Sequence, residues 1–142
     1  LFDKLVKKLR SRMGSLTTPM KITPKAILQM KNQAIAHALV ADQRIHPSDL
    51  WLPFFGYEVP VITGTEKLAR KYNLPVFYPQ MRKHKRGKYE IYPILLHKSP
   101  ADLEPFELTK LYFEQLKKDI IEQPHLWLLS HKRWKIKREI DE

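Results

Sequence analysis

The chain has no cysteine, very little glycine and no long hydrophobic run. Without cysteine, its 142 residues hold neither a disulfide framework nor a thiol-ligated metal. No apolar stretch approaches the roughly 20 residues that a membrane-spanning helix needs. With four glycines in all, there is no glycine-rich phosphate loop and no GxSxG motif, which argues against a self-contained nucleotide-binding or serine hydrolase domain. The six histidines show no HExxH and no metal-ligand spacing, so we expect no metal site and no cofactor.

What the chain does have is positive charge. Its 26 Lys and Arg outweigh 15 Asp and Glu, for a formal charge of +11. Such a charge attracts anionic partners: nucleic acid, phospholipid head groups, phosphorylated substrates or an acidic carrier protein. The length and the 43% apolar composition are those of one globular domain. The sequence starts at Leu1 without an initiator Met, inside an expected helix, so we expect it to be part of a longer protein.

Periodicity in the first half predicts two helices, one strand and a loop. Residues 1–13 form an amphipathic pattern that Gly14 ends. A second helix is predicted from Thr23 as N-cap, with Pro24 at the first helical position, to about Asn32. The apolar run 34–41 predicts a buried strand. Residues 42–60, with the aromatic cluster "LWLPFFG", are interpreted as a loop packed against the core or lining an apolar groove.

The second half reads as a helix, a hairpin and two further helices. Residues 63–73 carry a capping-box pattern with Glu66. The β-rich runs 74–81 and 89–96 flank a cationic turn containing Gly87, the outline of a hairpin. One helix is expected over residues 106–122 and another after Pro124. This order predicts an α/β fold in which a partial mixed β-sheet is flanked by helices, as part of a larger domain.

His37 and Asp42 could form a catalytic pair or merely share a segment. A His base needs a carboxylate within hydrogen-bond reach. On a strand, residues five apart point to opposite faces, so the strand interpretation separates them and favours a structural His37. Asp42 alone is the better candidate, because the carboxyl end of a buried α/β strand is where such folds bind ligands. The alternative is that Asp42 caps the following turn.

Two cationic stretches admit a structural and a functional interpretation. In "PHLWLLSHKRWKIKR", Trp127, His131 and Trp134 are spaced for one helical face among several cations. This pattern fits either a helix docked through its tryptophans or a contact with anionic lipid head groups. The turn "RKHKRGK" is either solvated or binds phosphate. No zinc finger and no RNP-like strand motif supports nucleic-acid binding.

Several of these stretches together resemble one family. The segment "LPFFGYEVPVITGTEKLARKYNLPVFYPQMRK", then "GKYEI", and the closing "PHLWLLSHKRWK" are similar to the late, lauroyl or myristoyl type of lipid A biosynthesis acyltransferases. That family lies within the glycerolipid acyltransferase superfamily. The "LRSRMG" of the first helix and the "DQ" at Asp42 and Gln43 fall in the same order as the family's motifs. The resemblance covers nearly the whole chain, although Leu129 stands where relatives commonly have a second Trp.

The resemblance implies transfer of a fatty acyl chain from acyl carrier protein to a hydroxyl of a lipid A precursor, at the cytoplasmic face of the inner membrane. In the family, the His of an HxxxxD/E dyad removes the acceptor proton as the oxygen attacks the thioester. That dyad precedes the Arg-rich helix, so we expect it upstream of Leu1. Residues 1–142 are then the C-terminal part of a single acyltransferase domain, inactive alone, and His37–Asp42 matches the dyad only in letters.

The resemblance also suggests roles for particular residues. Asp42 is expected to support the site, and a larger set is expected to bind substrate: Arg10, Arg12, Asp42, Gln43, Trp51, Phe54, Phe55 and Arg82. Contact with the anionic membrane is expected from Trp127, His131, Arg133, Trp134 and Lys135. The expected partners are acyl carrier protein, a lipid A precursor and the inner-membrane surface, without nucleic acid. The competing hypothesis is a stand-alone basic module that binds nucleic acid or anionic lipid.

Overall fold

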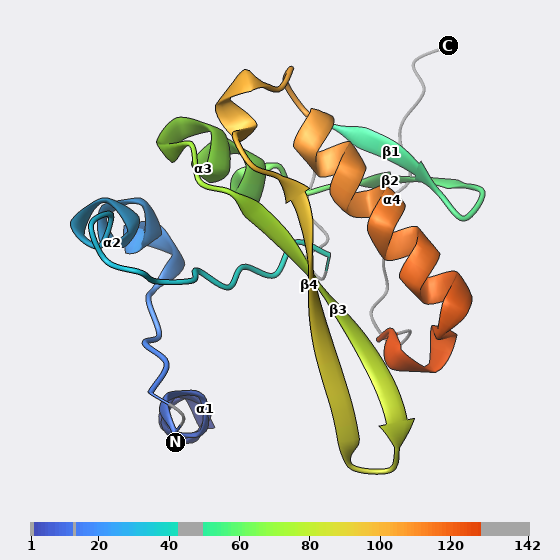
Figure 1. Cartoon of the computed structure of the whole chain (residues 1–142), viewed down its shortest axis with the longest axis horizontal. Coiled ribbons are helices and arrows are strands. Elements are labelled where there is room, and N and C mark those ends of the chain that lie inside the picture. Colours follow the sequence, from blue (N-terminus) through green and yellow to red (C-terminus); the bar gives the residue numbers. More distant parts are fainter. Residues whose placement is uncertain (1, 13, 43–49, 129–142) are drawn as a thin grey trace. The chain divides into compact units, whose positions relative to one another are not determined.

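In a computed structural model, the chain is described over residues 2–12, 14–42 and 50–128 (Figure 1). It divides into two compact units, residues 1–38 and residues 39–142. The first unit holds helix α1 (Phe2–Ser11), a 3-10 helix (Met20–Ile22) and helix α2 (Thr23–Gln29). Helix α1 confirms the amphipathic pattern, and Gly14 follows it with a φ of 80°. The predicted N-cap of α2 is wrong: Ile22 occupies that position, and the Thr23 hydroxyl donates to the Pro19 carbonyl at 3.3 Å.

The buried strand predicted over residues 34–41 is not formed. Residues 34–40 are exposed and have no strand structure, and only Ala41 is buried. A strand exists through hydrogen bonds to a neighbouring strand, and no strand of the described ranges pairs with this run. An apolar composition is therefore not sufficient to make it a strand here.

The second unit begins with a hairpin where a loop was predicted. Strands β1 (Trp51–Phe54) and β2 (Tyr57–Pro60) pair antiparallel, with Phe54 opposite Tyr57. The two-residue turn between them has positive φ angles at Phe55 (50°) and Gly56 (81°). Positive φ at both central residues defines a type I′ turn, whose twist matches the twist of the flanking strands. The expectation that this segment packs down is confirmed, because the hairpin supplies Leu52, Phe54 and Val59 to the core.

The remaining elements agree closely with the sequence patterns. Helix α3 (Gly64–Tyr72) ends at Asn73, whose left-handed conformation closes it. Strands β3 (Val76–Lys85) and β4 (Lys88–His97) form the predicted hairpin, with Gly87 at a φ of 76° in its turn. A 3-10 helix (Pro100–Asp102) leads to α4 (Glu107–Glu122). The predicted helix after Pro124 appears only as a single 3-10 turn (Pro124–Leu126), and its continuation past residue 128 lies outside the described residues.

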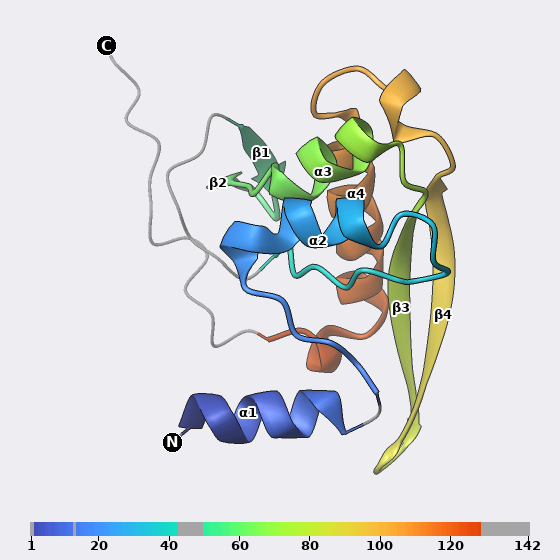
Figure 2. The same ribbon diagram turned by 90° about the vertical axis from the view of Figure 1, so that its left-hand side faces the viewer.

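Helix α4 lies between the two hairpins of the second unit (Figures 1 and 2). Its Leu116 and Ile120 pack with Tyr78 of β3 and with the apolar residues of β1 and β2. The α/β class is confirmed. Within the described ranges the strands form two antiparallel pairs, β1–β2 and β3–β4, and not one mixed sheet. As side chains alternate along a strand, one face of β3–β4 meets α4, and the other face leaves apolar residues exposed: Phe77, Met81, Tyr89, Ile91 and Leu95.

Candidate functional site

Asp42 and Trp127 are joined across the second unit by a hydrogen bond. The indole Nε1–H of Trp127 donates to Oδ2 of Asp42 at 3.2 Å. Trp127 directly follows the 3-10 turn that Pro124 begins, and its backbone N–H donates to the Pro124 carbonyl at 3.2 Å. Both side chains are half-buried. A carboxylate predicted to belong to the site is thus bound to an aromatic side chain 85 positions further along the chain.

Aromatic rings hold Trp127 in this position. Its indole stands edge-on to Phe54, with ring centroids 5.8 Å apart and planes at 67°, and tilted against Phe55 at 6.5 Å. Phe54 also stacks edge-on with Phe113 of α4 at 5.5 Å. Edge-to-face pairs at these distances are attractive because of the ring quadrupoles. The β1–β2 turn and α4 therefore fix the direction of the indole N–H.

A second carboxylate, Asp119 of α4, gathers three side chains from β3. The Tyr78 hydroxyl donates to its Oδ2 at 3.0 Å, and Gln80 Nε2 and Arg82 Nη1 donate to its Oδ1 at 2.6 and 3.3 Å. These donors stand two residues apart on β3, so they share the face that meets α4. One carboxylate consequently ties the hairpin to the helix.

The phenol of Tyr78 lies in the field of both carboxylates. Burial raises its pKa well above the ordinary value, and the charge of Asp119 and the hydrogen bond to it add to that shift. Tyr112 and the charge of Asp42 raise it further. Tyr78 therefore remains protonated at any physiological pH, and it serves as a hydrogen-bond donor and not as a base.

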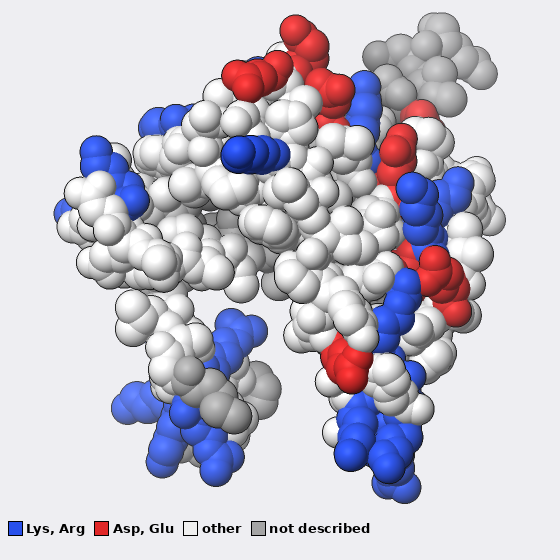
Figure 3. Space-filling view, viewed as in Figure 1, with Lys and Arg blue, Asp and Glu red and all other residues white. Residues whose placement is uncertain are grey.

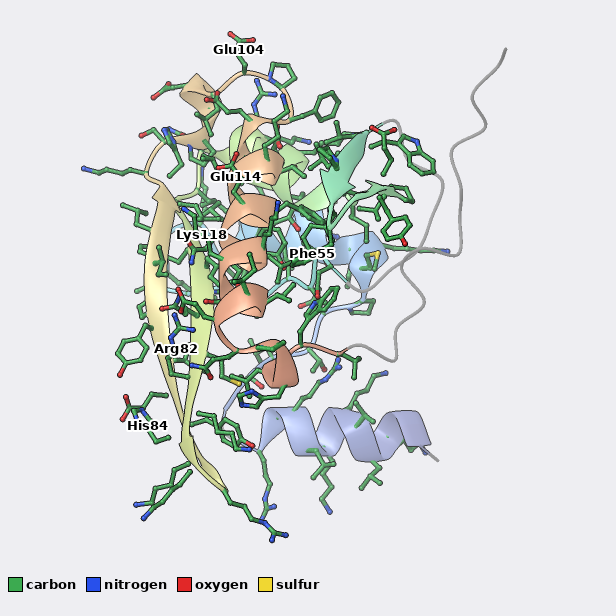
Figure 4. All side chains as sticks on the ribbon, turned by 90° about the vertical axis from the view of Figure 1, so that its right-hand side faces the viewer. Phe55, Arg82, His84, Glu104, Glu114 and Lys118 are labelled. Atoms are coloured by element: carbon green, nitrogen blue, oxygen red, sulfur yellow. The ribbon has the colours of Figure 1, made fainter. Side chains whose placement is uncertain are left out.

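Arg82, labelled in Figure 4, belongs to the edge of this network. Besides Asp119, its guanidinium forms an ion pair with Glu122 of the same helix. Its side chain keeps 21% of its surface exposed. A guanidinium that is paired with two carboxylates has a fixed orientation, and part of this one remains exposed to solvent.

Positive charge gathers over α1 and, separately, over the tip of the β3–β4 hairpin (Figure 3). We call the exposed cations at the end of that hairpin the hairpin tip: Lys83, Lys85, Arg86 and Lys88. On the neighbouring face, His84 lies 2.8 Å from Glu90. The Tyr92 hydroxyl, and then His84, lower the pKa of Glu90. That carboxylate is engaged locally, which leaves the tip cations as a cluster of one sign.

The other predicted site residues have different surroundings. Arg10 and Arg12 are exposed in the first unit, as is His37. Trp51 is half-buried, and Phe54 is 1% exposed in the core. Phe55 is half-buried in the β1–β2 turn, with the Lys117 ammonium 5.9 Å from its ring centre. Several predicted residues lie outside the described ranges: Gln43, His131, Arg133, Trp134 and Lys135.

Sequence reasoning did not select Tyr78, Gln80 or Asp119. A partial signal exists, since Tyr78, Gln80 and Arg82 alternate along a predicted strand and would share one face. Nothing in the sequence pairs that face with Asp119. Among the described His, Asp and Glu side chains, no three are grouped so that they could hold a metal ion. Within the described ranges, no helix is both long and apolar enough to cross a bilayer.

In the second unit, α4 and the β3–β4 hairpin of an α/β fold meet at a carboxylate-centred polar network, and the exposed hairpin tip is cationic. The family model of bacterial lipid A biosynthesis acyltransferases matches residues 1–136, and the chain belongs to this family. The resemblance inferred from the sequence motifs is thereby confirmed. No curated protein and no solved structure matches the chain significantly.

Proposed function

We propose that this chain is part of an enzyme that transfers a fatty acyl chain from acyl carrier protein to a hydroxyl of a lipid A precursor. The observation that carries the proposal is the family match over residues 1–136. Acyl transfer from a thioester needs a group that accepts the hydroxyl proton, a site for the acyl chain and a site for the polar acceptor. The described residues offer candidates for the last two.

The cations suit both substrates. Acyl carrier proteins are strongly acidic and lipid A precursors carry phosphates, so exposed guanidinium and ammonium groups can bind either through charge-assisted hydrogen bonds. Arg10 and Arg12 offer such groups in the first unit, and the hairpin tip offers them in the second, where Arg82 is only partly exposed. Because the ion pairs of Arg82 fix its direction, a phosphate would meet a guanidinium that is already oriented.

Aromatic residues and polar groups divide the second unit in a way that suits an acylated substrate. Trp51 and Phe55 are half-buried and are proposed to line the acyl groove, with Phe54 behind them in the core. Asp42 and Gln43 are proposed to contact the polar part of the acceptor. In this proposal the acyl chain meets the partly exposed rings and the hydroxyl-bearing sugar meets the carboxylate.

The catalytic base is proposed to come from an HxxxxD/E dyad outside these 142 residues. Asp42 is bound to Trp127, and His37 is an exposed residue of the other unit, so neither is assigned the role of base. We place the reaction at the cytoplasmic face of the inner membrane. The basic, Trp-containing run is proposed to contact its anionic lipids through His131, Arg133, Trp134 and Lys135.

The test is transfer of a labelled acyl group from acyl carrier protein to a purified lipid A precursor, followed by mass spectrometry. The full-length protein should form the acylated product, and the 142-residue chain alone should not. In the full-length protein, Arg10→Ala should lower turnover about tenfold if its guanidinium binds substrate. Lys25→Ala removes an exposed cation from the same unit and should leave turnover unchanged. Product formation by the 142 residues alone would overturn the assignment of the base.

The competing hypothesis of a nucleic-acid module is tested by a gel-shift titration with short duplex DNA and RNA. Generic charge attraction should collapse between about 50 and 200 mM salt, because binding through phosphate contacts alone is steeply salt-dependent. Saturable binding that persists at physiological salt, together with absence of acyl transfer, would favour the nucleic-acid module instead.

A further inference from the structure

The contact between Trp127 and Asp42 gives this tryptophan a role different from that of a membrane anchor. An interfacial indole presents its ring to lipid and its N–H to the head groups. Here the N–H is donated to Asp42, and the ring packs on Phe54 and Phe55. The half-buried indole therefore has a partner within the second unit for its N–H and ring contacts to Phe54 and Phe55.

The contacts of Trp127 come from elements with regular structure, whereas Asp42 does not lie in a helix or strand. Phe54 is 1% exposed and belongs to a paired strand, and Phe55 occupies a tight type I′ turn. Asp42, by contrast, lies in a segment without helix or strand structure, directly after Ala41. Backbone hydrogen bonds of a ladder therefore do not hold Asp42 in place. A side-chain contact to a rigid element is a direct way to fix the direction of its carboxylate.

We propose that Trp127 is a positioning residue for Asp42: its indole N–H, fixed by the β1–β2 turn, orients the carboxylate toward the polar part of the acceptor. This inference rests on the proposed function, in which Asp42 binds the acceptor. Trp127 acts through Asp42 and does not itself touch substrate. The same contact joins Trp127, which follows α4, to Asp42.

The hydrogen bond is tested without reference to activity by NMR of the full-length protein. The indole N–H signal of Trp127 is identified as the one that disappears in Trp127→Phe. In Asp42→Ala this signal should shift and its hydrogen exchange with solvent should accelerate, because its acceptor is gone. Tyr89→Phe, which changes an exposed ring far along β4, should leave the signal in place. An indole signal and exchange rate that Asp42→Ala does not alter would overturn the proposal.

The functional consequence is tested by steady-state kinetics. Trp127→Phe keeps an aromatic ring next to Phe54 and removes the N–H donor together with the smaller ring of the indole. It should raise KM for the lipid acceptor about tenfold while kcat changes little, as expected when an oriented charged hydrogen bond is lost from substrate binding. In an Asp42→Ala background the same substitution should add nothing, since a residue that acts through Asp42 has no effect without it.

Three results distinguish a failure of the positioning role of Trp127 from a failure of the proposed function. Additive effects of the two substitutions would show that Trp127 acts independently of Asp42 and would overturn the positioning role. An unchanged KM in Trp127→Phe, beside a raised KM in Asp42→Ala, would overturn it too. Absence of acyl transfer by the wild-type protein would overturn the proposed function, while the NMR result still decides whether Asp42 holds the indole.

Discussion

Glu66 of α3 and Thr109 of α4, 43 positions apart, are joined by two hydrogen bonds. Oε2 of Glu66 accepts from the Thr109 backbone N–H at 2.9 Å and from its hydroxyl at 2.6 Å. Oε1 of the same carboxylate accepts from the Phe106 N–H at 2.5 Å. The first N–H groups of a helix lack partners within the helix, and its dipole favours an anion there. Glu66, predicted to cap its own helix, caps α4 instead and fixes the start of the helix that carries Asp119.

Replacing this cap should destabilise the second unit. Glu66→Gln keeps the shape but turns an amide toward the N–H groups, and Glu66 is only 4% exposed, so water cannot compensate. We expect a loss of about 2–3 kcal/mol in the free energy of unfolding. Urea titration followed by circular dichroism measures it. Glu114→Gln on the exposed side of α4 is the matched control and should change stability by less than about 0.5 kcal/mol.

Asp119 should be the most sensitive carboxylate between the β3–β4 hairpin and α4. Asp119→Ala leaves the hydroxyl of the buried Tyr78 without its acceptor and removes one of the two ion pairs that Arg82 makes among the described residues. The expected loss in the free energy of unfolding is about 2–3 kcal/mol, since a buried polar group left without its hydrogen-bond partner costs more than the hydrogen bond itself contributes. Thermal unfolding of Asp119→Ala beside Glu114→Ala measures it. Equal melting temperatures for the two variants would contradict the bridging role.

The raised pKa of Tyr78 predicts a loss of stability at alkaline pH. Above the usual value of 10.0, the unfolded chain releases the phenol proton while the folded chain retains it. The unfolded state then binds fewer protons, so the free energy of unfolding falls as pH rises. The melting temperature of the wild type should drop more between about pH 9 and about pH 11 than that of Tyr78→Phe, which has no proton to release. Parallel curves for both proteins would contradict the assignment.

Elements that rest on local chemistry could be predicted from the sequence. Helix α4 follows from the spacing of its apolar residues, and α3 ends where Asn73 adopts a left-handed conformation. The β3–β4 hairpin follows from two β-rich runs around Gly87. In each case a few neighbouring residues determine the backbone, so the pattern is visible without knowledge of the fold.

The features that the sequence did not predict depend on residues that are distant in the chain. The run 34–41 has the composition of a strand, yet it has no strand neighbour among the described residues. The Phe55–Gly56 turn was missed because Phe is an unusual residue at positive φ, where Asn or Asp is the familiar signal. The carboxylates of Glu66, Asp119 and Asp42 each bind a group about 40 or more positions away. No periodicity reports such pairs, so the polar centre of the second unit appears only in the structure.

Under the proposed function, the hairpin tip is a candidate contact for acyl carrier protein. If its cations meet the acidic carrier protein, the pair Lys85→Glu and Lys88→Glu should raise KM for acyl carrier protein about tenfold at low salt and flatten its salt dependence. The pair Lys67→Glu and Lys110→Glu reverses the same amount of exposed charge elsewhere in the unit and should have a smaller effect. A short acyl-pantetheine donor lacks the acidic protein, so with it the tip variant should equal the wild type. A defect that persists with acyl-pantetheine would place the tip against the lipid acceptor instead, because the acceptor is then the remaining anionic substrate.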